Sequence, residues 1–186
     1  MSCISQIAQN ILPDCENPKV AGFEGRAIVI GYSDFVTNST ITFVSDSKTK
    51  IETIDLDGQG KRAQIYGENP YNGTNEALTR EDGVEKYIHQ VALRIADRGA
   101  DAGDNIVAPL ARGRHVVFQV TNDGKVFVHG LYGVLKANEQ TQNEYENNGD
   151  WMVTLQDSEP YPVVEVVGTV ARTALQEFEV AWNAIV

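Results

Sequence analysis

Short runs in which apolar and polar residues alternate predict that β-strands make up much of this chain. Residues 40–44 and 50–56 alternate cleanly, and residues 27–32 form a short apolar run bounded by turn-forming residues. Further strands are expected at residues 64–66, 151–156 and 163–170. The pattern therefore indicates a β-rich architecture.

The strongest single signal predicts a β-hairpin at residues 114–131. Asp123-Gly124 separates two apolar runs, which is typical of a two-residue hairpin turn. With that turn, Val120 faces Phe127 and Phe118 faces His129. One face then carries Val116, Phe118, Val120, Phe127, His129 and Leu131, and the other carries Val117, Gln119, Thr121, Val126 and Val128. Because both faces hold apolar residues, we expect one face to pack on the domain core and the other on a second layer or a neighbouring subunit.

Residues 84–96 fit two patterns. A helix would place Val84, Ile88 and Val91 on one stripe, whereas a strand would place Val91, Leu93 and Ile95 on one face. We choose the strand, because only the strand turns Leu93 inward.

One short helix is expected from Asn105 to about Arg112. Asp104 is a suitable N-cap residue and Gly113 a suitable stop. Pro109 lies inside this segment and removes one backbone hydrogen bond, so we expect a short or irregular helix.

The remaining segments are polar or broken by proline. Residues 1–19 carry a small apolar stripe and are expected to form an arm that packs on its own domain or on a neighbour. Residues 67–83 are expected to form a long polar loop, and long loops in compact domains are commonly functional or disordered. A polar connection is expected to follow Ala137, and residues 159–162 to form a rigid extended connector.

Length and composition suit one domain. The 186 residues divide into the arm at 1–19 and a single β-rich domain at 20–186. The expected fold is mainly β, an antiparallel β-sandwich or open barrel with one short packed helix, an N-terminal arm and a long loop. No apolar run is long enough for a membrane-spanning helix, and the N-terminus lacks the pattern of a signal peptide.

The net charge of −11 is concentrated near the C-terminus. Residues 137–186 hold nine acidic residues and one base, Arg172, and thus −8 of the total. Such a surface repels phosphate backbones and disfavours tight nucleic-acid binding. It is either a solvated face that aids solubility or a surface past which nucleic acid moves without sticking.

Candidate chemistry is sparse. Asp55 and Asp57 resemble part of a calcium loop, but the other ligand positions do not match, so a tight turn is the better interpretation. Cys3 and Cys15 are interpreted as free thiols. The three histidines, His89, His115 and His129, have no metal-binding spacing, and His129 is interpreted as a hydrogen-bonded core residue. Since no catalytic or cofactor motif is present, we predict no enzyme, no cofactor and no metal.

The order of elements in residues 84–156 resembles the tail tube proteins of long-tailed bacteriophages and of related injection machines. The resemblance is carried by YIHQVALRI, NIVAPLARGRHVVFQV, GKVFVHGLYGVLKAN and GDWMVTLQDSEPYP. It is a likeness of pattern over about 70 residues without an invariant motif, and the N-terminal arm with its two cysteines does not map onto the family.

The resemblance implies a virion structural protein, assembled in the host cytoplasm, whose rings stack into a hollow tube. The implied partners are copies of the chain itself, other tail proteins, and DNA that passes without tight binding. Long loops would reach adjacent rings, and the lumen would be acidic. The alternative is a stand-alone β-sandwich module for capsid or tail decoration or for carbohydrate binding, with aromatic residues drawn from Tyr66, Tyr71, Trp151 and Tyr161.

Overall fold

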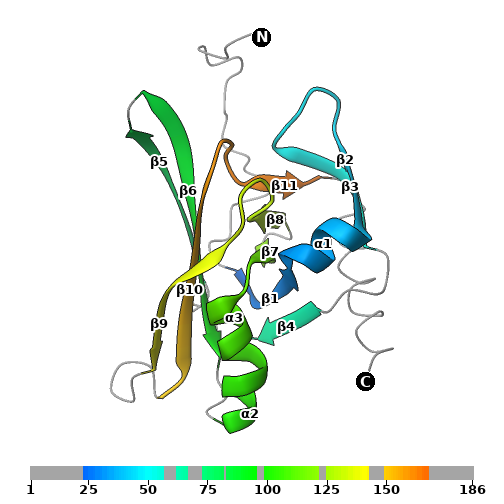
Figure 1. The fold of residues 1–186 in the computed structure, drawn as a ribbon. Helices are drawn as coiled ribbons and strands as arrows, with labels where there is room; N and C mark the ends of the chain where they lie inside the picture. The colour runs from blue at the N-terminus through cyan, green and yellow to red at the C-terminus, as the bar shows by residue number, and fades with distance from the viewer. Residues whose placement is uncertain are drawn as a thin grey trace, which may run out of the picture.

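In the part of the chain that it describes, the computed structural model has two β-sheets and two short helical segments (Figure 1). The residues that it describes are 23–56, 62–66, 73–81, 83–95, 99–121, 125–142 and 149–167. The expected arm at residues 1–19, its two cysteines, Asp57 and Tyr71 lie outside them. Within this described part of the chain, no helix is both long and apolar enough to cross a membrane.

The larger sheet has seven strands in the order β2-β3-β11-β8-β7-β1-β4. Their bounds are β1 Phe23–Gly31, β2 Ser39–Phe43, β3 Lys50–Leu56, β4 Arg62–Tyr66, β7 His115–Thr121, β8 Val126–His129 and β11 Val164–Val166. All neighbouring pairs are antiparallel except β11 and β3, which are parallel.

Chain connectivity requires this sheet to curl. Strands β3 and β4 are separated by five strand spacings in the sheet order, or about 24 Å if the sheet were flat. Only six Cα–Cα links join Leu56 to Arg62, and they reach at most about 20–22 Å. The sheet must therefore curve, and we call this curved seven-stranded sheet the barrel.

The barrel interior forms one apolar cluster. It gathers buried residues from β1, β3, β7, β8 and β11 together with Phe35 of α1 (Tyr32–Asn38). The residues in this cluster are Ile28, Ile30, Phe35, Ile51, Ile54, Val116, Phe118, Val120, Val126, Val128, Val164 and Val166. Helix α1 was not predicted, because its sequence YSDFVTN buries only one residue and has no amphipathic stripe.

The smaller sheet has four antiparallel strands and covers the outside of the barrel. Its order is β5-β6-β10-β9, with bounds β5 Gly73–Glu81, β6 Val84–Ile95, β10 Trp151–Glu159 and β9 Lys136–Gln142. A second apolar cluster lies between the sheets and joins Val29 and Val117 of the barrel to Leu93 and Leu155 of the smaller sheet. The expected mainly β fold, two packed layers with a short helix, is confirmed.

The segment predicted as a strand at residues 84–96 is described as far as Ile95 and is a strand over Val84–Ile95. Strand β6 buries Val91, Leu93 and Ile95 against the barrel. The strands predicted at 27–32, 40–44, 50–56, 64–66 and 151–156 are also present within a residue or a few of the expected ends, whereas the strand expected at 163–170 is described only as β11.

The 114–131 hairpin forms, but with a different register. Phe118 pairs with Val128, not with His129. The Thr121 N–H donates to the Lys125 carbonyl at 2.8 Å, and the Lys125 N–H donates to the Thr121 hydroxyl at 3.1 Å. Three residues therefore separate the paired ends, where the sequence predicted a two-residue turn.

This one-residue slip reverses the face of every β8 side chain. Val126 and Val128 lie inside the barrel with Phe118, whereas Phe127 and His129 face the smaller sheet. The prediction that both faces of β7 are buried is confirmed, since His115 to Val120 are all buried. The second layer is the four-stranded sheet.

Two polar segments form strands that were not predicted. Strand β5 occupies most of the expected 67–83 loop, and β9 occupies part of the polar connection. Both lie at the edges of the four-stranded sheet and are largely exposed, so neither carries a buried apolar face. Without a buried face there is no period-2 pattern to read.

The helical segment begins earlier than predicted. It comprises α2 (Ala100–Ala102), a π-helical turn (Gly103–Val107) and α3 (Ala108–Arg112). Asp104 lies inside the π turn and is not the N-cap. The wide turn directly precedes Pro109, whose missing N–H interrupts the regular bonding pattern. Gly113 ends the helix as expected, and its N–H donates to the Pro109 carbonyl at 2.8 Å.

Candidate functional site

A group of polar side chains is buried between the barrel and the four-stranded sheet. His89 comes from β6, Asp157 and Glu159 from β10, and Gln119 and His129 from β7 and β8. His89, Gln119, His129 and Glu159 are each at most 1% exposed. We call these five residues the inter-sheet cluster.

Alternation along the strands explains how these residues meet. On β6 and β10 they continue the faces that bury Val91, Leu93, Val153 and Leu155. On β8 the observed register turns His129 toward the smaller sheet. The cluster thus occupies the end of the inter-sheet layer, where apolar packing gives way to polar side chains.

The two histidines lie against each other. The ring centroids of His89 and His129 are 6.0 Å apart, and the planes meet at 89°. Among the described residues, no hydrogen-bond partner contacts either nitrogen of the His129 ring. His129 is therefore a core residue as predicted, but the predicted hydrogen bond is not found. Burial and the neighbouring His89 lower the pKa of His129 to about 3, so its ring is neutral at physiological pH.

Glu159 is the most perturbed carboxyl. Burial, assisted by the nearby Asp157, raises its pKa to about 7, although backbone groups around Tyr132 lower it slightly. Its Oε1 lies 3.7 Å from Nδ1 of His89, beyond hydrogen-bonding distance. Burial also lowers the pKa of His89. Burial thus disfavours the charged form of both groups, which favours a neutral acid facing a neutral base over an ion pair.

The observed position of the Asp157 side chain requires a glycine at residue 133. A Cβ added to Gly133 would overlap the Asp157 carboxylate, so only glycine leaves room for it. Burial raises the pKa of Asp157. Burial therefore makes the ionised forms of both Asp157 and Glu159 costly inside the cluster.

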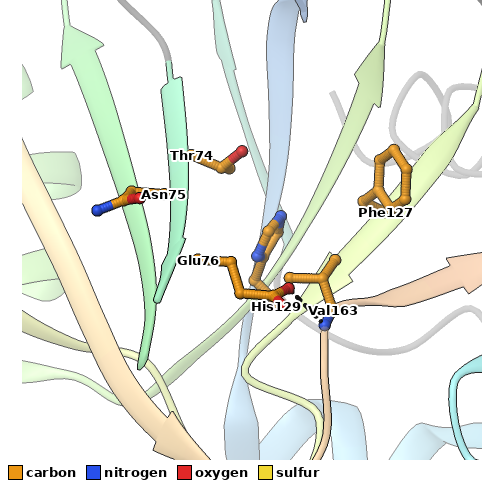
Figure 2. A pocket seen from close by; sticks show the side chains of 6 residues that line it. All are labelled: Thr74, Asn75, Glu76, Phe127, His129 and Val163. Carbon is orange, nitrogen blue, oxygen red and sulfur yellow. Dashed lines mark hydrogen bonds between the residues drawn. The ribbon is translucent and has the colours of Figure 1, made fainter. Parts of the chain in front are cut away.

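One pocket opens beside the cluster (Figure 2). Its volume is about 180 Å³, and it lies between edge strand β5 and strand β8. The side chains of Thr74 and Glu76 point toward the His129 ring, whereas that of Asn75 points away. Phe127 and Val163 complete the lining. The Val163 N–H donates to Oε2 of Glu76 at 2.8 Å, which ties β5 to the segment before β11.

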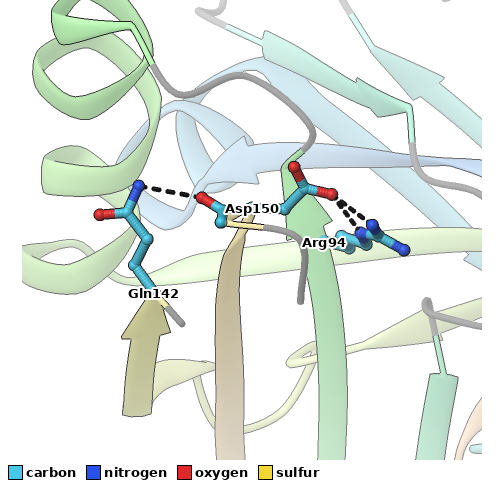
Figure 3. A network of polar contacts seen from close by, with 4 residues as sticks. Arg94, Gln142 and Asp150 are labelled. Carbon is cyan, nitrogen blue, oxygen red and sulfur yellow. Dashed lines mark hydrogen bonds and ion pairs between the residues drawn. The ribbon is translucent and has the colours of Figure 1, made fainter. Parts of the chain in front are cut away.

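A second polar network lies in the four-stranded sheet at the end opposite the inter-sheet cluster (Figure 3). Nε of Arg94 donates to Oδ2 of Asp150 at 2.5 Å, and Nη2 also contacts this oxygen. Nearby, Nε2 of Gln142 donates to the Gly149 carbonyl at 3.0 Å. Both charged residues are buried, so this pair orders the start of β10.

The acidic segment is not the uniformly solvated face that one interpretation of the sequence expected. Of its nine acids, five are described. Asp150 and Glu159 are buried and Asp157 is half-buried, so only Glu139 and Glu165 remain at or near the surface. Glu165 lies 3.9 Å from Lys125.

His115 and the aromatic residues Trp151 and Tyr161, also singled out in the sequence, lie in three different settings. The His115 ring lies 3.2 Å from the Pro109 carbonyl, at the end of the helix and away from the other histidines. Trp151 and Tyr161 are half-buried, and Tyr161 packs its ring against Tyr132 at 4.9 Å. These two aromatics therefore do not form an exposed platform. Among the described residues, no group of three or more His, Cys, Asp or Glu is placed to hold a metal ion.

The four-stranded sheet also forms a distinct surface. Its edge strands, β5 with nine residues and β9 with seven, have no strand partner on their outer sides among the described residues. The β5–β6 hairpin projects past the barrel (Figure 1). Leu78 and Val84 near its tip are 57% and 53% exposed. Arg80 and Glu85 form an exposed ion pair between them.

Replacing Glu159 with glutamine is expected to change how stability depends on pH. In the wild type the folded carboxyl keeps its proton up to about pH 7, whereas the unfolded carboxyl loses it near 4.5. The free energy of unfolding therefore falls as pH rises between these values, by about 3 kcal/mol. The amide cannot ionise and should lack this loss, so Glu159→Gln gains stability relative to the wild type between pH 4 and pH 8.

Urea denaturation at the two pH values measures this difference. His129 makes the opposite contribution, losing stability as pH falls from 6.5 toward 3, but both proteins share it. Glu139→Gln is the control, because Glu139 is exposed. A difference between wild type and Glu159→Gln that does not change with pH would show that Glu159 titrates normally.

Comparison of this chain with protein-family models, with curated proteins and with solved structures finds no match.

Proposed function

We propose that this chain is a structural subunit that assembles with copies of itself into rings, and that the rings stack into a tube for DNA, as in a bacteriophage tail tube. The proposal places the tube in a virion, in contact with other tail proteins. Two observations support this proposal. One is the pattern resemblance of residues 84–156, and the other is the open edges of the four-stranded sheet.

Open edges favour association. An edge strand presents unpaired N–H and C=O groups, and stable monomers usually cover, shorten or interrupt such edges. Here β5 runs for nine residues without a proline, while β9 is interrupted only by an irregularity in its pairing with β10. The two edges differ, so a contact between β5 of one subunit and β9 of the next would be heterologous. Contacts of this kind close into rings when the rotation permits.

The projecting hairpin supports the same proposal. A two-stranded ribbon is marginally stable alone, and the tip of this one extends beyond the core with Leu78 and Val84 in solvent. Covering two such side chains stabilises a contact by about 1.5–3 kcal/mol each. Within the segment that the sequence predicted as a long loop, residues 73–81 thus form one strand of this hairpin, which is available for the same contact.

Charge is consistent with passage of DNA without tight binding. The chain carries a net charge of −11. Lys86 and Lys136 lie on the outer face of the four-stranded sheet, but most of the other side chains on it are uncharged, among them Asn75, Gln90, Thr154 and Gln156. Such uncharged groups offer phosphate no counterion-release attraction.

A matched set of lysine variants tests assembly. The double variant Leu78→Lys with Val84→Lys should raise the concentration at which half the protein is assembled by at least about tenfold, a change of about 1.4 kcal/mol. Light scattering and negative-stain microscopy give the readout. Val36→Lys on α1 is the control, since Val36 is 60% exposed but lies away from the four-stranded sheet.

Two outcomes would contradict the proposal. One is a wild-type protein that stays monomeric at every concentration, with or without a nucleating tail component; tight sugar binding by that monomer would favour the binding-module alternative. The other is an equal effect of Val36→Lys, which would show that the hairpin has no special part in assembly.

A further inference from the structure

The pocket between β5 and β8 contains a feature that assembly does not explain. His129 lines it while being only 1% exposed, and neither ring nitrogen has a hydrogen-bond partner among the described residues. A buried polar group without a partner costs about 1–3 kcal/mol. Such a cost is commonly offset by a ligand or ordered water in the adjoining space.

The side chains that line the pocket indicate which kind of ligand would offset the cost of the unpartnered His129 ring. A neutral imidazole offers one acceptor nitrogen and one N–H. Glu76 brings a carboxylate to the same space, and Thr74 brings a hydroxyl (Figure 2). Among the described residues that line the pocket there is no Lys or Arg. The lining therefore favours a cation that donates hydrogen bonds and disfavours an anion.

The size and shape of the pocket limit the class of ligand further. The 180 Å³ of space is smaller than the roughly 300–1,000 Å³ of pockets for drug-sized ligands. Phe127 and Val163 form an apolar wall opposite the polar groups. A bare metal ion would need more ligands than are grouped here. A short alkyl chain that ends in an ammonium group would place its alkyl part on the apolar wall and its ammonium group beside the polar groups.

We propose that this pocket binds a small primary ammonium compound. The ammonium group donates hydrogen bonds to the His129 ring and to the Glu76 carboxylate, and the alkyl part lies against Phe127. His129 remains neutral in this complex, in keeping with its low pKa. Three of the lining residues belong to edge strand β5, which the proposed assembly also uses, so the site is tested on single subunits.

Nuclear magnetic resonance of the histidine rings tests this directly. The chain has three histidines: His129 lines the pocket, His89 touches His129, and His115 lies elsewhere. In ¹⁵N-histidine-labelled full-length protein, kept at a concentration where scattering shows single subunits, n-butylammonium should shift the unprotonated His129 nitrogen saturably. His115 should not move. The same concentrations of 1-butanol and of butyrate should leave His129 unchanged.

Variants then separate charge recognition from simple occupancy. Glu76→Gln should weaken n-butylammonium binding at least about tenfold, because a charge-assisted hydrogen bond is lost. Glu139→Gln removes the same charge from an exposed site on β9 and should leave affinity unchanged. An unchanged His115 signal verifies that each variant is folded.

Three results would overturn the proposal. Equal shifts with 1-butanol would show an apolar cavity without recognition of charge. No shift of His129 at any n-butylammonium concentration would show that the pocket holds only water. Equal weakening by Glu76→Gln and Glu139→Gln would show a general effect of net charge. None of these results bears on ring assembly.

Discussion

Replacing Phe118 with alanine is expected to lower the free energy of unfolding by about 3–5 kcal/mol. Phe118 is 1% exposed inside the barrel, where its ring packs against Phe35 at 6.1 Å. Its neighbours on adjacent strands are Ile28 and Val128. Removing the ring leaves a cavity in a layer built from five strands, and this layer has little freedom to collapse. Equilibrium denaturation in urea measures the loss.

Phe127→Ala is the matched comparison, since it deletes the same ring from the next strand of the hairpin. Phe127 faces the smaller sheet and is only partly buried, so we expect a smaller loss than for Phe118→Ala. The two-residue turn predicted from sequence would put both rings on one face. Equal losses for the two variants would therefore support that register and contradict the observed one.

Gly130→Ala is expected to destabilise the domain by about 3 kcal/mol, through two separate effects. Gly130 has a φ of +82°, where an L side chain costs about 1–2 kcal/mol. Its added Cβ would also lie 2.7 Å from the His115 carbonyl oxygen. That oxygen accepts a hydrogen bond from the Leu135 N–H at 3.0 Å, so neither backbone segment can move away cheaply. Thermal and urea denaturation both report this change.

Gly83→Ala separates the two effects. Gly83 has nearly the same φ, +77°, but no atom lies within 4 Å of its added Cβ. This variant should lose only the conformational part, about 1–2 kcal/mol. If Gly130→Ala were no more harmful than Gly83→Ala, the close approach of the His115 backbone would not contribute.

The strands with a buried face were readable from sequence. Residues 50–56 gave β3 with its exact ends, and the choice of strand for residues 84–96 was correct because only that pattern turned Leu93 inward. These segments alternate because one side of each strand contacts the core. The edge strands β5 and β9 lack that contact, so their sequences resemble loops.

The inter-sheet cluster could not be read from sequence. His89 and Glu159 are 70 residues apart, and no local pattern links them. His129 was recognised as a core residue and its partner strand was predicted, but the pairing register was shifted by one residue. Asp157 and Glu159 were counted as part of an acidic surface, because charged residues are usually exposed. Only the pairing of β6 with β10 brings these groups together.

Hydrophobic periodicity in the sequence thus determined that this protein is mainly β, where its buried strands lie, and that β7 is covered on both faces. Periodicity reports whether a side chain is buried, because burial of apolar area is the dominant favourable term in folding. It does not report which strand lies opposite. Tertiary structure alone decided the three-residue hairpin loop, the curl of the larger sheet, the edge strands, and the meeting of His89, His129 and Glu159. Except for the hairpin loop, each of these depends on contacts between segments distant in sequence. In the hairpin itself, a one-residue change in register is enough to redirect every side chain of a strand.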